Sequence, residues 1–480
     1  MDLYYQIAVN FPKSDSVLTY HSDSEFKIGD LVEVPLGRRK AKGTILGPTS
    51  DESVKAIDSS KIKSVKGKLE NSFQLTTKEI ELYSWMSKYY HYSLGKLIFD
   101  CLPKILKRPR QPKFLEGRGE ELPFELNEDQ SHIFSDIAKR IESGFSQNYI
   151  HGVTGSGKSA VYLSLMKKVL DSGKSVQFLL PEINLTPQFT QMFEAFLGCK
   201  ILVFHSGVTP SDKYNIWRAL NESADPVLIM GVRSSIFLPI QNLGLVIVDE
   251  EHDQSFKQTD RCTYNGRDVA IKKAQLHSCP FVMGSATPSL ENFHQFESEE
   301  NKTENKRHYY TIKERASSGE FPKLELLDTR EKFKEKDVIY PFLEKTIEDI
   351  KVRLELGEQV LIFINKLGFS SYIQCRNCGH QFYDENCGCQ NNLRYFKKKN
   401  LLSCAHCEFK MPLPSECPEC GGISIVNKGF GTEKVEQVLS EIFPEKNIER
   451  FDRDEIKTTK DLNDKPVSYT HLTLPTKRIV

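Results

Sequence analysis

Two patterns in this sequence could do chemistry, and the first is a glycine-rich loop. The segment GVTGSGKS, which begins at Gly152, fits the G-x-x-x-x-G-K-[ST] pattern of phosphate-binding loops. Glycines such as Gly155 and Gly157 let backbone amides surround phosphate oxygens. Lys158 reaches the β- and γ-phosphates, and the Ser159 hydroxyl ligates Mg²⁺. The loop therefore predicts ATP and Mg²⁺ as cofactors.

The second pattern is a cluster of thiols, because eight of the twelve cysteines lie between residues 375 and 420 as four close pairs. Four such pairs can close two tetrahedral thiolate sites, the geometry that Zn²⁺ prefers. Disulfides are the alternative, but closely paired cysteines without a secretion signal favour metal in a reducing compartment. The pairs are Cys375 and Cys378, Cys387 and Cys389, Cys404 and Cys407, and Cys417 and Cys420.

An acidic segment downstream complements the phosphate-binding loop. Four apolar residues, 245–248, lead directly into Asp249-Glu-Glu-His252, as expected for a buried strand that ends in acids. Asp249 at the end of the strand can hold Mg²⁺ through water, and Glu250 can orient and deprotonate the attacking water. An exposed acidic turn is the alternative, which the four apolar residues disfavour.

Composition limits the possible classes of function. The formal net charge is zero, so no global field attracts nucleic acid. No run of about 18 apolar residues is present, so we expect no membrane partner. The N-terminus lacks the pattern of a signal peptide, which predicts a cytoplasmic location. Basic residues cluster at 38–42, 104–113 and 397–399, and each cluster alone is more often a solvated face than a DNA contact.

The hydrophobic pattern predicts an α/β fold with a β-rich beginning. Residues 1 to about 70 alternate apolar and polar residues with glycine turns, and residues 76–90 have helical spacing after a threonine cap. Short apolar runs then alternate with helical segments, which predicts buried parallel strands. These runs are Asn148–Ile150, Val176–Leu180, Ile201–Phe204, Val227–Met230, Leu245–Val248, Phe281–Met283 and Val360–Ile364.

Taken together, these motifs look like those of a superfamily-two helicase, and in order along the chain they resemble the PriA family, DNA helicases that restart stalled replication forks. The resemblance covers about residues 1–460. The matching segments include GDLVEVPLG at 29–37, WMSKYYHYSLGKLIFDCLP at 85–103, GVTGSGKS at 152–159, PEINLTPQ at 181–188, GVRSSIF at 231–237, VDEEHDQSFKQ at 248–258, YNGRD at 264–268, GSATPS at 284–289, FINKLGFS at 363–370, GFGTEKVE at 429–436 and RFDRDE at 450–455.

The resemblance implies RecA-like phosphate-loop helicase lobes with an N-terminal β-rich DNA-binding domain and a zinc-ribbon insertion. In order, it implies a 3′ DNA-end-binding domain (1–105), a linker (106–125), helicase lobe 1 (126–322), an incomplete lobe 2 (323–372 and 424–466) and a zinc-binding insertion (373–423). The last stretch, 467–480, matches nothing in the family, and we expect it to be a non-native tail.

The resemblance also implies roles for single residues. Gln130 would read the adenine, and an aromatic-rich loop with Phe256, Lys257 and Tyr264 would link DNA to ATP hydrolysis. Aromatic rings can stack on any base, although both rings could instead be core residues. Arg233, beside a glycine, suits a nucleic-acid phosphate. The candidate phosphate contacts in the N-terminal domain are Arg38 and Arg39.

In the family the eight cysteines bind two structural zinc ions in a nested order. The resemblance therefore implies an outer site of Cys375, Cys378, Cys417 and Cys420 and an inner site of Cys387, Cys389, Cys404 and Cys407. The inner site departs from the family because Cys387-Gly-Cys389 stands where C-x-x-C is expected. Cys387 is therefore the least certain of the ligands.

Two further departures concern whole segments. About twenty residues separate Pro103 from Leu126, so the winged helix usual in the family is expected to be absent. The later lobe-2 motifs, including the arginine finger, are not found after RFDRDE, which predicts a C-terminal truncation.

The implied function is an ATP-dependent 3′-to-5′ DNA helicase that recognises stalled forks and helps to load the replicative helicase. Its implied partners are forked DNA with a free 3′ end, other primosome proteins, a replicative helicase loader and single-strand-binding protein. This chain would have little motor activity because of the missing motifs. The alternative is a DNA- and protein-binding scaffold without helicase activity.

Overall fold

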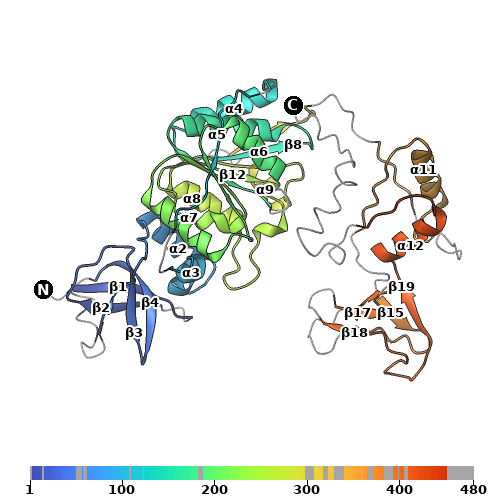
Figure 1. The fold of residues 1–480 in the computed structure, drawn as a ribbon, viewed down its shortest axis with the longest axis horizontal. Coiled ribbons are helices and arrows are strands. Elements are labelled where there is room, and N and C mark those ends of the chain that lie inside the picture. Colours follow the sequence, from blue (N-terminus) through green and yellow to red (C-terminus); the bar gives the residue numbers. More distant parts are fainter. Residues whose placement is uncertain are drawn as a thin grey trace. The chain divides into compact units, whose positions relative to one another are not determined.

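The computed structural model divides the chain into two compact units, one that runs up to Glu320 and one that begins at Phe321. Figure 1 colours the first unit from blue to yellow and the second in orange and red. The described residues are 3–12, 16–49, 54, 57, 62–106, 110–122, 124–181, 187–297, 307–316, 323–328, 340–364, 372–382, 393–397, 399–404 and 409–450.

The first unit begins with a six-stranded sheet, as the alternating pattern predicts. Its strand order is β5-β2-β1-β4-β3-β6, and its core holds Tyr5, Ile7, Val32, Val34 and Ile45. The antiparallel β3–β4 hairpin projects Arg38 and Arg39 into solvent. The strands are β1 (Leu3–Val9), β2 (Val17–Ser22), β3 (Leu31–Leu36), β4 (Arg39–Pro48), β5 (Lys63–Ser64) and β6 (Gly67–Lys68).

Two helices follow the small sheet. Helix α2 (Thr77–Tyr89) begins at the predicted cap, since Thr76 and Glu79 form a reciprocal capping box. Helix α3 (Leu94–Cys101) begins at Ser93. The apolar faces of both helices join the hydrophobic cluster of lobe 1, which also includes Ala8 and Leu31 of the small sheet.

Lobe 1 is a mostly parallel eight-stranded sheet in the order β14-β8-β13-β12-β9-β11-β10-β7, with β7 antiparallel to β10. Separate hydrophobic clusters lie on its two faces, one with α4, α5 and α6 and the other with α7, α8 and α9 (Figure 1). This layering is the α/β architecture that the sequence predicts.

The strands of lobe 1 are β7 (Leu115–Glu116), β8 (Gln147–Gly152), β9 (Ser175–Leu179), β10 (Lys200–Phe204), β11 (Val227–Gly231), β12 (Leu243–Asp249), β13 (Phe281–Ser285) and β14 (Arg307–Ile312). Its α-helices are α4 (Glu128–Arg140), α5 (Lys158–Asp171), α6 (Pro187–Phe196), α7 (Pro210–Glu222), α8 (Gly266–Leu276) and α9 (Leu290–Glu297). Two short 3₁₀ helices, η3 (Arg233–Phe237) and η4 (Gln254–Phe256), follow β11 and β12.

One predicted strand is wrong. Residues Val360–Ile364 form no strand, although the other six predicted runs do. An apolar run becomes a buried strand only where neighbouring strands take up its backbone groups. Here alternate residues pack against α11 (Glu344–Glu355) and α12 (Thr432–Ile442), whereas Leu361 and Phe363 are 74% and 87% exposed.

The other described elements of the second unit are short strands. Strands β15 (Tyr372–Cys375) and β19 (Ile425–Lys428) pair antiparallel, and β16 (Arg394–Phe396), β17 (Leu401–Ser403) and β18 (Lys410–Pro412) form a small antiparallel sheet. Among the described residues of both units, no helix is long and apolar enough to cross a membrane.

The shared core makes a prediction about cooperativity. Met86 on α2 is fully buried, so Met86→Ala should lower the free energy of unfolding by about 2–5 kcal/mol. Because α2 belongs to the core of lobe 1, helix and lobe should unfold together. The two tryptophans allow a direct measurement, since Trp85 lies on α2 and Trp217 on α7.

Urea unfolding of the two single-tryptophan variants should report the same shift for Met86→Ala from either side. Glu81→Ala, on the exposed face of α2, is the matched control and should shift neither curve. A shift confined to the Trp85 signal would show that the helix is an independent unit.

Candidate nucleotide and metal sites

The phosphate-binding loop lies between β8 and α5, which is the strand–loop–helix context that the pattern requires. Gly155 and Gly157 both have φ of 77°, a left-handed conformation that favours glycine. Gly157 is the N-cap of α5, and no side chain caps this helix end. The amides of the first turn are therefore available to a phosphate group, which the helix dipole also attracts.

The predicted catalytic groups lie beside this loop. Lys158 Nζ donates a hydrogen bond of 2.9 Å to the Gly152 carbonyl, and Tyr162 donates one of 3.1 Å to Asp249 Oδ1. Burial lowers the pKa of Lys158, an effect that Asp249 and Glu250 oppose. Burial, and then the charge of Glu250, raise the pKa of Asp249 to about 6, against the attraction of Lys158. A bound Mg²⁺ would stabilise the ionised carboxylate.

The backbone separates the side chains of the three consecutive acids that begin at the last residue of β12. Asp249 and Glu251 are buried, whereas the side chain of Glu250 is 32% exposed. Glu250 adopts φ of 48°, a left-handed conformation that costs a non-glycine residue about 1–2 kcal/mol. This turn leaves Glu250 accessible, as a residue that orients water must be.

Glu251 is a functional candidate that sequence reasoning missed. Its fully buried carboxylate accepts hydrogen bonds from Tyr149 (2.8 Å) and the Ser289 backbone (2.8 Å). Arg267 forms an ion pair with it at 2.7 Å, and Asn292 donates another bond. Glu251 belongs to the DEEH segment and Arg267 to the YNGRD segment, but only the fold brings the two side chains together.

The GSATPS segment at 284–289 is linked to the acidic segment. His252 Nδ1 and Ser285 Oγ share a hydrogen bond of 2.7 Å, and Ser285 Oγ also accepts from the Thr287 backbone. Ser285 is the serine of the Ser-Ala-Thr segment at the end of β13, next to β12. The hydrogen bond at His252 therefore joins this segment to the acidic segment.

Gln130 lies against the phosphate-binding loop. Its side-chain amide donates a hydrogen bond of 2.9 Å to the Ser156 carbonyl, and its oxygen accepts from the Asn127 backbone in a capping box. A methyl group on Gly157 would lie 2.4 Å from Gln130 Nε2, so the Gln130 amide would have to shift to make room for it. That Gln130 reads adenine stays a prediction.

The aromatic rings of the predicted DNA-contact loop are buried. Phe256 and Tyr264 are 2% and 7% exposed, so the alternative that they are core residues describes their position in this structure. Arg233 donates hydrogen bonds to the Ser255 and Lys257 carbonyls, and its guanidinium lies 5.8 Å from the centre of the Tyr264 ring. Of the three predicted contact residues, only Lys257 is exposed, so a DNA contact by either ring requires this loop to move.

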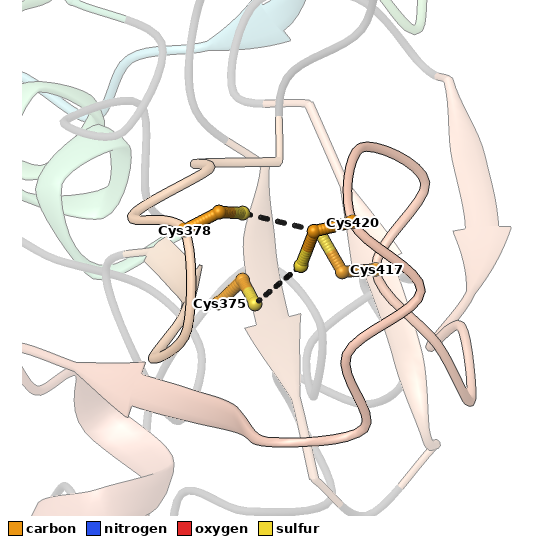
Figure 2. A group of neighbouring side chains, drawn as sticks. All are labelled: Cys375, Cys378, Cys417 and Cys420. Atoms are coloured by element: carbon orange, nitrogen blue, oxygen red, sulfur yellow. Dashed lines mark hydrogen bonds between the residues drawn. The ribbon is translucent and has the colours of Figure 1, made fainter.

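Four cysteines of the second unit form a candidate metal site (Figure 2). The thiols of Cys375, Cys378, Cys417 and Cys420 all lie within 4.8 Å of one another. The Sγ atoms are 3.7 Å apart between Cys375 and Cys420 and 3.6 Å apart between Cys378 and Cys417. A tetrahedral zinc with Zn–S bonds near 2.3 Å requires about 3.8 Å between sulfurs, whereas a disulfide requires about 2.05 Å. The geometry fits zinc.

Two loops with the same backbone bonds present these thiols. In one, the Gly379 amide donates to the Cys375 carbonyl (2.9 Å), and in the other Gly421 donates to Cys417 (2.9 Å). Both glycines have left-handed φ, 78° and 68°. Hydrogen bonds from the backbone of Cys378 and then Asn377 lower the pKa of Cys375 to about 7, against burial. These backbone hydrogen bonds therefore favour the thiolate form of Cys375, the form that a metal binds.

Only one cysteine of the predicted inner zinc site lies among the described residues. Cys404 is buried at the end of the small three-stranded sheet. Cys387, Cys389 and Cys407 lie outside the described residues, so the second zinc ion stays a prediction.

Lobe 1 defines the class of the protein. A phosphate-binding loop and an acid-tipped strand within a parallel sheet are the features of a superfamily-two helicase lobe. In agreement, residues 123–290 match the family model described as "Type III restriction enzyme, res subunit".

The N-terminal residues specify the family. Residues 6–103 match the PriA model described as "3'DNA-binding domain (3'BD)". The chain belongs to the PriA family of replication restart helicases.

Curated relatives agree along most of the chain. The chain is 35% identical to "Replication restart protein PriA" of Bacillus subtilis over 360 residues, which cover 75% of this chain and 43% of the relative. It is 32% identical to that of Rickettsia conorii over 443 residues, which cover 92% of this chain and 65% of the relative. The chain thus spans less than two thirds of the length of these relatives.

Among solved structures, the chain is similar to that titled "Structure of RecG bound to three-way DNA junction". The match has 18% identity and a TM-score of 0.29, and it covers 50% of this chain and 30% of the other. A score this low adds nothing to the family assignment.

The cysteine geometry makes a prediction about metal content. The purified chain should contain close to two zinc ions, and Cys417→Ser should lose about one of them, because three thiolates cannot close a structural site. Unfolding of the insertion should accompany the loss, since structural zinc supplies folding energy. Elemental analysis against protein concentration measures the metal.

Cys199→Ser removes a half-buried thiol outside the cluster and should keep the full zinc content. Well under one zinc ion in the parent chain, or disulfides between these cysteines under native conditions, would contradict the assignment.

Proposed function

We propose that the chain is the DNA-end-binding and nucleotide-binding part of an ATP-dependent 3′-to-5′ DNA helicase, which recognises stalled forks and helps to load the replicative helicase. The observation that carries this proposal is the nucleotide site itself. The charges of Asp249 and Glu250 act on Lys158 beside an uncapped helix end, in the same compact unit as a domain that matches a 3′ DNA-binding model.

Each group of the nucleotide site has a proposed task. The first-turn amides and Lys158 bind the phosphates, and Ser159 and Asp249 hold Mg²⁺. Glu250, which is accessible, orients the attacking water and accepts its proton. Bound Mg²⁺ would neutralise charge on the β- and γ-phosphate oxygens.

A groove in the N-terminal domain supports the proposed DNA contact. Its volume is about 700 Å³, and it lies between the β3–β4 hairpin and the end of α3. Arg39 and Lys42 supply positive charge, while Phe11 and Phe99 supply aromatic surface. Single-stranded DNA is held by this combination, because phosphates need cations and bases stack on rings. Arg38 lies next to this groove on the hairpin turn and is exposed.

The proposed partners follow from the family. They are forked DNA with a free 3′ end, other primosome proteins, a replicative helicase loader and single-strand-binding protein. The proposed location is the cytoplasm, where thiols such as those of the four-cysteine site stay reduced.

The alternative function is a DNA- and protein-binding scaffold. One observation favours it for this polypeptide: the 480 residues contain no Q-x-x-GRAGR-like segment that could supply an arginine finger. An intact Lys158 beside Asp249 and Glu250 favours the enzyme. The two candidates differ in DNA-stimulated turnover.

The DNA groove gives a prediction. Replacing Arg39 and Lys42 by alanine should weaken binding of a fork with a free 3′ end, because two phosphate contacts are lost. The slope of log K against log salt should flatten by roughly 1.4 for single-stranded contacts. Fluorescence anisotropy across a salt series on the whole chain measures both effects.

The matched control replaces by alanine two exposed lysines on helices of the same unit, Lys139 on α4 and Lys168 on α5. This double alanine variant should bind like the parent. Failure of the parent to bind fork DNA even at low salt would contradict the DNA assignment.

The motor gives another prediction. The 480-residue chain should bind Mg-ATP but show almost no DNA-stimulated ATPase and no unwinding, since an arginine finger is typically worth about 10³ to 10⁵ in rate. Fusion to the C-terminal portion of a longer relative should recover both activities, and Lys158→Ala in the fusion should abolish them. Rapid DNA-stimulated turnover by the 480 residues alone would disprove the scaffold alternative and this expectation together.

A further inference from the structure

The helices of the N-terminal domain form one wall of the aromatic-rich loop of lobe 1. Tyr83 on α2 stacks on Phe237 at 5.9 Å between ring centres, and Phe237 packs edge-on against Tyr264 at 5.3 Å. On its other side, Tyr264 lies under the guanidinium of Arg233. The loop is therefore held between lobe 1 and the N-terminal domain, which explains why its rings are buried.

Buried charges also lie at the seam between α2 and α8. Lys273 on α8 donates hydrogen bonds of 2.8 Å to the Ile236 and Leu238 carbonyls. The negative charge of Glu79 on α2 acts on the same buried ammonium across the seam. Separation of α2 from α8 would remove this compensation, so the two helices behave as one body.

One hydrogen bond joins the seam to the base of the loop. Tyr90 is the C-cap residue of α2. Its hydroxyl accepts a hydrogen bond of 3.2 Å from the Asn265 amide. Asn265 pairs with Lys257 across the base of the loop, as the two ends of a small hairpin. Lys257 and Arg261 are exposed basic residues of this loop. Tyr90 thus contacts the residue that pairs with Lys257.

From Asn265 the contacts continue to the nucleotide site. The Asn265 side chain caps α8 by accepting from the Arg267 amide at 3.0 Å. Arg267 forms the buried ion pair with Glu251. Glu251 directly follows Glu250, the proposed water-orienting residue. The chain of contacts therefore ends one residue from the proposed chemistry.

In the other direction the contacts reach the DNA groove. Ser93, three residues beyond Tyr90, donates a hydrogen bond of 2.5 Å to the Phe11 carbonyl. Phe11 lines the groove of the N-terminal domain, as do Phe99 and Leu102 at the far end of α3. The groove and the nucleotide site are thus connected by hydrogen bonds and two short helices.

We infer that Tyr90 is a positioning residue that couples occupancy of the DNA-end groove to Mg-nucleotide binding in lobe 1, through Asn265, Arg267 and Glu251. The inference rests on the proposed function, because it assumes that the groove binds a 3′ DNA end. The coupling factor, the ratio of nucleotide dissociation constants without and with DNA, measures this coupling directly.

The experiment uses the whole chain and needs no turnover. A fluorescent, non-hydrolysable ATP analogue with Mg²⁺ is titrated without and with a saturating 3′-ended oligonucleotide. We expect a coupling factor of about 5 to 150 in the parent. Titration of the DNA without and with nucleotide must return the same factor, because coupling is reciprocal.

Tyr90→Phe keeps the ring and removes only the hydroxyl. It should lower the coupling factor about 2- to 10-fold, the amount that one hydrogen bond provides, while the nucleotide dissociation constant without DNA stays at the parent value. A merely structural role would instead change both dissociation constants and leave their ratio unaltered.

Two controls delete a hydroxyl nearby. Tyr89→Phe acts on a ring that is 60% exposed, next to Tyr90. Tyr83→Phe acts on a buried hydroxyl that has no hydrogen-bond partner among the described residues. Both should keep the parent coupling factor.

Three outcomes overturn the inference. A parent coupling factor of one, with both ligands bound, refutes it and leaves the proposed function standing. An unchanged factor in Tyr90→Phe refutes the role of Tyr90. No binding of 3′-ended DNA by the parent refutes the proposed function, and the inference with it.

Discussion

The buried carboxylate of Glu251 is the constraint on which the arrangement of lobe 1 depends. A buried charge is tolerated only when it is paired and hydrogen-bonded. Glu251 meets this requirement with donors from β8, from the start of α8 and from the segment around the start of α9. Because these donors come from distant parts of the sequence, satisfying one carboxylate fixes several elements around the nucleotide site. Asp249 and Glu250 directly precede Glu251, so the contacts of Glu251 also help to fix where these two residues lie.

Much of the site was predictable because its determinants are local. Eight consecutive residues define the phosphate-binding loop, and one apolar strand followed by acids defines the partner segment. The outer cysteines were also predictable, since the resemblance names them and the geometry brings Cys375, Cys378, Cys417 and Cys420 together. In each case a short segment has a conformation that its own residues largely determine.

The rest of the site depends on contacts that no local pattern contains. The ion pair between Arg267 and Glu251 joins two segments whose spacing carries no signal. The burial of Phe256 and Tyr264 depends on the helices of the N-terminal domain, so an aromatic-rich loop looks the same in sequence whether its rings are exposed or packed. The run Val360–Ile364 is apolar enough for a strand, but only neighbouring strands could make it one.

The hydrophobic core does not follow the boundary between the two matched families. One family model ends at residue 103 and the other begins at residue 123, whereas a single cluster of buried side chains includes α2, α3 and one face of lobe 1. The N-terminal domain therefore matches a family model of its own, but it shares a hydrophobic core with lobe 1. Excising it would strip apolar surface from the motor lobe, so a loss of activity after such a deletion would not distinguish lost DNA recognition from a damaged enzyme.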